Sequence, residues 1–232
     1  MSGAQTEGLR ARKKRVARET IAATARRLFA ERGFDTVTVA EIAAAADVSE
    51  KTVFNHFPTK VDLAFAGREE GIMRLVADIT ERPPGASVLD VFRALTTTAI
   101  DDFVAPGNED LLAVARIIRH SPTLQERLTV GWESGAAAVT AAIAATSGAA
   151  DDDLVPGIVA RTLWWTHRSI FLDALQGLSA EEDREQLVVR LRVAADRAYD
   201  QLADGLGEYG RAGVASVRSS WPGAPADPCR RA

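Results

Sequence analysis

Four neighbouring side chains have the chemistry to read the edges of DNA bases. Lysine donates hydrogen bonds to guanine, asparagine pairs with the edge of adenine, and threonine contacts either. The short helix predicted to carry them turns Val53 and Phe57 inward, so the four share its outward face: Lys51, Thr52, Asn55 and His56. A short polar helix face of this kind suits a reading helix laid in the major groove.

Capping and turn residues over 38–57 predict the two helices that would position this face. Thr38 and Glu41 have the spacing of a capping box, which starts a first helix. Asp47 tolerates the left-handed backbone of a tight turn, and Ser49 caps the second helix. The pattern therefore predicts a helix-turn-helix; the plainer alternative is a helical hairpin within an ordinary core.

Basic residues stand on both sides of this motif. Upstream, Arg12, Lys13, Lys14 and Arg15 form a run with no acid, and Lys60 follows the motif directly. Residues 1–60 carry a net charge of +4 and the remaining residues −8. We expect the basic run, Lys60 and Thr38 to contact phosphate, which fixes register without reading sequence. The alternative for the run is a solvated tail.

At these residues the chain resembles the tetracycline-repressor (TetR) family of transcription regulators. The resemblance covers about residues 12–65, with the first helix matched by ARETIAATARRLFAERGF, which starts at Ala17. Two positions depart from the family pattern. Phe54 stands where the family usually has tyrosine, so a phenol contact to phosphate is lost and packing remains. Glu50 opens the reading helix, where its charge repels phosphate unless it accepts a hydrogen bond from a cytosine amino group.

Helical periodicity and the absence of two-residue alternation predict an all-α chain of about nine helices. The predicted division is a disordered arm at 1–11, a DNA-binding domain at 12–59, a helical ligand-binding and dimerisation domain at 60–207, and a flexible tail at 208–232. Helices are expected over 60–80, 88–103, around 111–118, 122 to 147, from 151–153 to about 176, and after Ser179, which with Glu182 would cap the last one.

By the resemblance, the helices between Lys60 and Gln176 enclose a small-molecule pocket. Its candidate lining residues are mostly aromatic: Met73, Phe92, Phe103, Trp132, Trp164, His167 and Phe171. Each also fits a plain core position, and His120 or His167 would serve as polar anchor.

The resemblance also implies a homodimer through the last two long helices. The last helix has an apolar seam of Leu187, Leu191, Ala194, Ala198 and Leu202, and the preceding one is apolar on all sides between Leu163 and Leu175. Burial within one subunit is the alternative for both.

Signals for other classes of protein are weak. The three histidines are scattered, and neither a metal-ligand spacing nor a phosphate-binding glycine loop is found, so we expect no catalytic residue, metal or cofactor. The single cysteine and the lack of a leader or spanning segment favour the cytoplasm, with no membrane partner. The GxxxG pair at Gly131 and Gly135 encloses Trp132, Glu133 and Ser134 and has polar flanks, so we do not expect it to act in a membrane.

The sequence thus predicts a homodimeric regulator that binds double-stranded operator DNA and is released by a small-molecule effector. Repression is expected, although nothing in the sequence separates it from activation. The second hypothesis is a helical carrier or enzyme that keeps a vestigial DNA-binding head, for which Glu50 and Phe54 are the best support.

Overall fold

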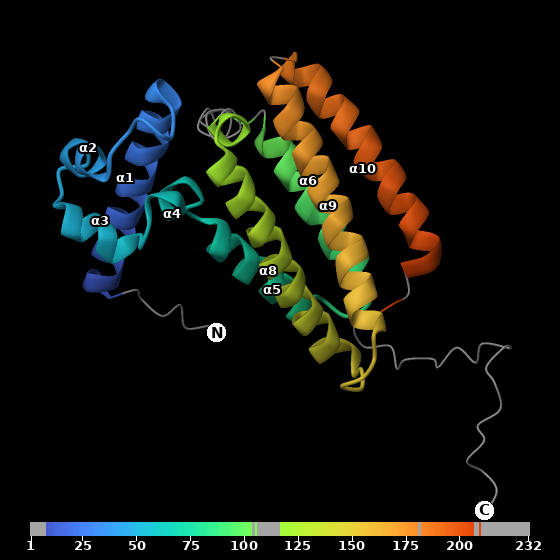
Figure 1. Cartoon of the computed structure of the whole chain (residues 1–232). Helices are drawn as coiled ribbons and strands as arrows, with labels where there is room; N and C mark the ends of the chain where they lie inside the picture. Colours follow the sequence, from blue (N-terminus) through green and yellow to red (C-terminus); the bar gives the residue numbers. More distant parts are fainter. Residues whose placement is uncertain (1–7, 104, 106–116, 181, 207–208, 210–232) are drawn as a thin grey trace, which may run out of the picture.

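The computed structural model describes residues 8–103, 105, 117–180, 182–206 and 209. Within these residues the chain is helical and has no strand. Figure 1 shows two parts: a small N-terminal group of three helices, here called the head (residues 8–57), and a larger bundle, here called the body (residues 68–206).

The helices run in the order α1 (Leu9–Arg32), α2 (Val39–Ala45), α3 (Glu50–His56), α4 (Lys60–Ala64), α5 (Arg68–Thr80), α6 (Val88–Asp102), α8 (Pro122–Ser147), α9 (Val155–Ser179) and α10 (Arg184–Leu206). Residues 117–120 are also helical. The expected short helix around 111–118 lies mostly outside the described residues, and so does the expected tail except Tyr209.

The first helix begins earlier than the sequence suggests. It starts at Leu9, so residues 9–11, for which a disordered arm is expected, are helical, and Arg12 to Arg15 lie on the N-terminal turns of the helix. Arginine and lysine are good helix formers, and the Arg15–Glu19 pair at 3.0 Å adds a contact one turn apart. The basic side chains are therefore presented by a helix.

The head is built on a small apolar core. Ile21, Ala25 and Phe29 of α1 are almost fully buried against Ile42 of α2 and Val53 of α3. Ala43 is also buried, and its small side chain lets α2 and α3 cross closely. This packing fixes α3 on α1, so that the polar face of α3 is left outside.

The single helix predicted over 60–80 is wrong, because the chain breaks into α4 and α5. Gly67 has φ of +91°, a left-handed backbone that other residues adopt only at a cost. The turn at residues 65–67 redirects the chain from the head to the body. The side chains buried on the two helices are Leu63 on α4 and Leu75 and Ile79 on α5.

The body is a bundle in which α9 lies between α8, α6 and α10. This position explains why α9 is apolar on several sides: Leu163, Trp164 and Ile170 are all buried. By length and composition alone α8 is apolar enough to cross a membrane, but it packs against α5 and α9 as a core helix of the bundle.

The boundary between the last two helices differs from the prediction. Helix α9 was expected to end at about Gln176, but it continues to Ser179. Ser179 therefore ends α9 and does not begin α10. Asp183 caps α10 in its place, since its carboxylate accepts a hydrogen bond from the backbone N–H of Gln186 at 2.9 Å. Aspartate and serine have similar capping preference, so the sequence pattern offered both choices.

Candidate nucleic-acid interface

The caps predicted for the helix-turn-helix are present. The backbone N–H of Glu41 donates to the Thr38 hydroxyl at 3.2 Å, and the Glu41 carboxylate accepts from the Thr38 backbone at 2.7 Å. The bond from the Thr38 backbone is the largest cause, and the hydrogen bond from the Arg32 guanidinium the second, of a pKa for Glu41 that is lowered to about 2. Asp47 occupies the left-handed region with φ of +55°, and Ser49 caps α3 through the Thr52 N–H at 3.1 Å. The turn therefore forms as the residue types require.

The outer face of α3 carries the predicted reading residues. Lys51 and Asn55 are exposed, and Glu50 is exposed at the first turn. Phe54 is 47% exposed, an unusual position for a large aromatic side chain. It belongs neither to the core nor to the side chains packed against it, so the packing expected for it is not made within the described residues. Thr52 is half-buried, and its hydroxyl lies 2.9 Å from that of Ser49.

His56 ends the reading helix close to the basic helix. Burial lowers the pKa of its imidazole, and the nearby charges of Lys14 and Arg18 lower it further. Both effects favour the neutral ring. Its backbone carbonyl accepts a hydrogen bond from the Arg18 guanidinium at 2.5 Å. Lys14 is thus near the C-terminal end of α3, and the positive charges of α1 and the polar face of α3 belong to one surface.

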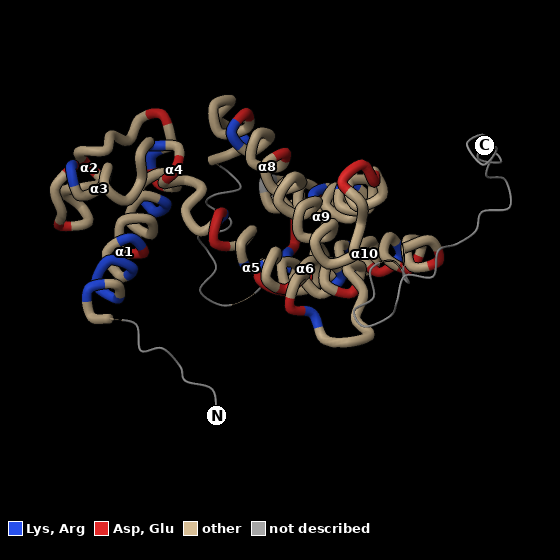
Figure 2. Tube along the Cα trace, turned by 90° about the horizontal axis from the view of Figure 1, so that it is seen from below, with Lys and Arg blue, Asp and Glu red and all other residues tan. Residues whose placement is uncertain are grey.

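Figure 2 shows that lysine and arginine gather along the N-terminal half of α1, away from the body. All four residues of the expected basic run are exposed there: Arg12, Lys13, Lys14 and Arg15. A cluster of exposed cations at the end of one helix, beside a reading helix, is the arrangement that phosphate contacts require.

Lys60 and Thr38 already have partners within the chain. The Lys60 ammonium lies 4.5 Å from the ring centroid of Phe34 and donates to the Asp35 carbonyl at 3.4 Å. Burial lowers the pKa of Lys60. The Thr38 hydroxyl donates to Glu41 at 2.8 Å in the capping box. Phosphate contacts by these two residues remain a prediction, and each would have to share or replace an existing contact.

Arg18 is a residue of this surface whose role the sequence did not reveal. Its guanidinium lies 4.3 Å from the centroid of the Phe57 ring and pairs with Glu70 of α5 at 3.2 Å. Together with its bond to the His56 carbonyl, these contacts tie α1, the end of α3 and the body. The partners are 38 and 52 residues away in sequence, so local patterns could not indicate them.

Five of the seven expected pocket residues meet in one packed cluster of the body, here called the aromatic cluster: Phe92, Trp132, Trp164, His167 and Phe171. The Trp132 and Trp164 rings are 4.9 Å apart, and the Trp164 indole N–H donates to the Trp132 carbonyl at 2.8 Å. A Cβ at Gly135 would lie 2.3 Å from the Trp164 ring, so this glycine makes room for the indole.

A short buried chain of hydrogen bonds leads from the aromatic cluster to α10. The Nδ1 atom of His167 lies 2.9 Å from the Thr96 hydroxyl, which lies 2.7 Å from the Tyr199 hydroxyl. Burial, with a smaller contribution from Arg68, lowers the pKa of His167 to about 4. The imidazole is therefore neutral at neutral pH, and the chain links α6, α9 and α10.

Each of two cavities is lined by one of the expected pocket residues. One, of about 680 Å³, lies between head and body and is lined by Met73; the other, of about 420 Å³, lies between α8 and α9 and is lined by Trp132. Met73 is 59% exposed, and Phe103 is buried away from both cavities. The role of the seven residues in ligand binding remains a prediction.

The seam expected on the last helix divides between two faces. Leu187 and Leu191 are fully buried within the subunit, which is the alternative stated above, whereas Ala194 is exposed. Outward-facing apolar residues of α10 are instead Val189 and Val193, at 61% and 54% exposure. In the described part of the chain no cluster of three or more metal-ligating side chains occurs.

The comparisons with known proteins agree with this geometry. The family model "Bacterial regulatory proteins, tetR family" matches residues 21–66, which span most of the head and α4. The chain is 28% identical over 201 residues to the HTH-type transcriptional regulator TcmR of Streptomyces glaucescens, a match that covers 84% of this chain and 88% of TcmR.

One further relative matches about half of the chain, and one solved structure has the same fold. The chain is 32% identical over 122 residues to the HTH-type transcriptional repressor Rv1474c of Mycobacterium tuberculosis, covering 51% of this chain and 57% of that protein. The SmeT–triclosan complex has the same fold, with a TM-score of 0.55, 21% identity, and coverage of 87% of this chain and 97% of that one. The head thus carries the DNA-binding domain of the tetR family, and with this head and its helical body the chain is a DNA-binding transcription regulator.

Proposed function

We propose that this regulator is a cytoplasmic, homodimeric repressor, whose reading helix α3 enters the major groove of its operator and whose release follows the binding of a small molecule to the body. The observation that carries the proposal is the exposed polar face of α3 beside the basic end of α1. The division of labour follows the two parts: residues 12–59 bind DNA, and residues 60–207 bind ligand and partner subunit.

Base contacts are assigned to the exposed side chains of α3. Lys51 donates to guanine and Asn55 pairs with adenine, while Phe54 supplies an apolar surface for a thymine methyl group. Thr52 and His56 lie at the edge of this face, and Glu50 accepts from a cytosine amino group. Phosphate contacts are assigned to Arg12, Lys13, Lys14 and Arg15, with Lys60 and Thr38 at the periphery.

A second subunit is needed for the mechanism. Paired reading helices contact successive major-groove faces when they are about 34 Å apart. The exposed Val189 and Val193 of α10 and Ile158 of α9 favour a two-fold contact through these two helices. An effector that prefers the form with misplaced heads lowers operator affinity by its coupling free energy, typically about 1–3 kcal/mol.

The family relationship supports repression and effector response. Rv1474c is named a repressor, and the SmeT–triclosan complex is a protein of this fold with a small molecule bound. No catalytic step is assigned to the chain: the Thr96 hydroxyl and the His167 imidazole lie 2.9 Å apart, but both side chains are buried within the body.

The deciding experiment is selection of bound fragments from a random pool of duplex DNA, followed by a gel shift with the selected site. Binding is expected with a steep salt dependence, since each phosphate neutralised adds about 0.9 to the slope of log affinity against log salt. Protein that enriches no sequence, or whose affinity is unchanged between low and moderate salt, would contradict the proposal.

A further inference from the structure

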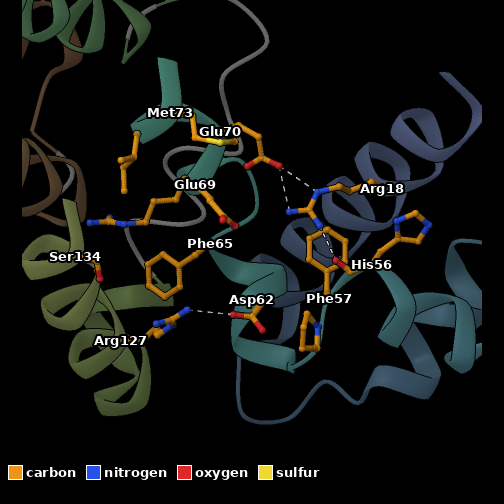
Figure 3. A pocket seen from close by; sticks show the side chains of 14 residues that line it. Arg18, His56, Phe57, Asp62, Phe65, Glu69, Glu70, Met73, Arg127 and Ser134 are labelled. Atoms are coloured by element: carbon orange, nitrogen blue, oxygen red, sulfur yellow. Dashed lines mark hydrogen bonds and ion pairs between the residues drawn. The ribbon is translucent and has the colours of Figure 1, made fainter. Parts of the chain in front are cut away.

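The cleft between head and body contains a largely buried arginine, Arg68, in its wall. This cleft of about 680 Å³ is lined by residues of α1, α3, α4, α5 and α8 (Figure 3). Arg68, the first residue of α5, lies on the side of the body. Its Nε atom is buried and has no hydrogen-bond partner.

The acidic side chains of the cleft leave Arg68 without a counter-ion. Asp62 pairs with Arg127 at 3.4 Å, and Glu70 pairs with Arg18 at 3.2 Å; Figure 3 shows both pairs. Glu69 is exposed, and within the described residues no carboxylate forms an ion pair with Arg68.

Two effects lower the pKa of Arg68. Burial is the larger, and the nearby Arg127 is the smaller; together they bring it to about 10, so the guanidinium is still charged at neutral pH. The neighbouring titratable groups His56 and His167 also have lowered pKa values and add no negative charge. A partly buried cation that lacks a counter-ion is costly, and a bound anion would offset that cost.

The surroundings hold the guanidinium in place. A Cβ at Gly131 would lie 2.8 Å from the Arg68 Nε, so α8 has a glycine where the guanidinium lies against it. The guanidinium carbon also lies 4.8 Å from the centroid of the Trp132 ring. The two glycines that resemble a membrane dimer motif thus make room for two side chains, Gly131 for Arg68 and Gly135 for Trp164.

We propose that this cleft binds an amphipathic carboxylate, whose carboxylate group accepts hydrogen bonds from Arg68 and whose apolar part lies against Phe65, Ile72 and Met73. The volume is in the range of small-molecule sites, and the planar guanidinium suits a carboxylate. This inference rests on the proposed function, because it names the chemical class of the effector and its site.

The position of the cleft connects this ligand to DNA binding. Arg18 joins Glu70, two residues after Arg68 on α5, to the carbonyl at the end of the reading helix. An anion at Arg68 adds negative charge near Glu70 and fills the space between head and body. Occupancy therefore shifts the population toward heads at a different angle.

The test measures binding of decanoate and 2-naphthoate, each against its neutral amide, by calorimetry on the full chain. For at least one of the two pairs the carboxylate is expected to bind at least tenfold more tightly than the amide, and Arg68→Gln is expected to abolish this preference. The matched control is Arg168→Gln, which removes an arginine from the wall of the other cavity. It should leave the preference unchanged.

Three results would overturn the assignment: no carboxylate bound up to millimolar concentration, equal affinity for acid and amide, or a preference that is kept in Arg68→Gln. The measurement contains no DNA, so it fails or succeeds independently of operator selection, which tests the repressor function.

A second measurement needs no ligand. An arginine kept for a ligand contributes little to folding, so the melting temperature of Arg68→Met should stay equal or rise. A fall of more than about 4 °C, on the order expected for loss of a structural contact in a chain of this size, would assign Arg68 to stability and overturn the proposal.

Discussion

At the residue scale, two lysines on the same surface are expected to act differently. Lys51 lies on the exposed face of α3, whereas Lys14 lies on the basic end of α1. Lys51→Ala is expected to cost about 1–3 kcal/mol on the operator and less on a mutated operator, because a base contact carries sequence information. Lys14→Ala is expected to weaken binding to both DNAs alike, because phosphate is present in every sequence.

The measurement is a gel shift of both variants on the selected operator and on the same duplex with its central base pairs exchanged. The salt slope provides the control, since it should fall by about one in Lys14→Ala if that residue releases a counter-ion. Equal losses on both duplexes for both variants would show that Lys51 does not read a base.

His167 gives the molecule a predictable dependence on pH. Its pKa is lowered from 6.5 to about 4 in the folded chain, mainly by burial. Between these values the unfolded chain binds a proton that the folded chain excludes, so stability decreases as pH falls through this window. The decrease is at most about 1.4 kcal/mol per pH unit.

Urea unfolding at several pH values between 4 and 7 measures this slope. His167→Gln is the comparison, because glutamine lacks the titration and can still bond with Thr96. The variant should lose part of the slope, while the contributions of His56 and the carboxylates are the same in both proteins. Identical slopes would contradict the assignment.

At the element scale, the features that sequence could predict were local. The capping boxes of Thr38–Glu41, Thr59–Asp62 and Ser87–Asp90 are all present, because each depends on residues three apart. The break at Gly67 was missed, since a glycine within a helical pattern is often tolerated. The boundary at Ser179 was missed because Asp183 competes as a cap.

The candidate sites show the same division. The outer face of α3 follows from helical spacing over seven residues, so the exposure of Lys51 and Asn55 could be predicted from sequence. Arg18 and Arg68 obtain their environments from residues on other helices, and no local pattern encodes such contacts. Aromatic residues could be assigned to the body, but only the fold shows that five of them pack together.

The crossing of α8 and α9 depends on a glycine. Gly135→Ala would place a Cβ 2.3 Å from the Trp164 ring, so the indole or the helices must move. We expect a loss of about 1–3 kcal/mol, as for other overpacked cores. Gly157→Ala is the matched control, because its Cβ would lie at an ordinary 3.8 Å from Thr140.

Thermal or urea unfolding of the two variants separates packing from helix propensity. Both substitutions replace glycine by alanine within a helix, which by itself favours folding by up to about 1 kcal/mol. Gly157→Ala should therefore be neutral or stabilising. Equal effects of the two variants would mean that the close approach of Trp164 to α8 is not a source of specificity in this bundle.

At the scale of the whole molecule, opposite charges are separated between the two parts of the chain. The first 60 residues have a net charge of +4 and the rest −8. A negative body is repelled by DNA and a positive head is attracted, so the field of the molecule favours approach with the head first. This separation also explains why the overall isoelectric point near 5.5 gives no sign of a DNA-binding protein.

The proposed mechanism also needs two heads, and the subunit contact that would pair them can be tested on α10. Val193 is 54% exposed, and in the proposed dimer it is covered by the partner subunit. Val193→Glu would place two like charges across a two-fold contact, so we expect dissociation into monomers and loss of cooperative operator binding.

Val130→Glu on α8, at 50% exposure in the free chain, is the control and should leave the dimer intact. Sedimentation velocity measures the mass of both variants. A dimer that persists in Val193→Glu but not in Val130→Glu would place the contact between subunits on α8, and the two reading helices would then lie at a different spacing.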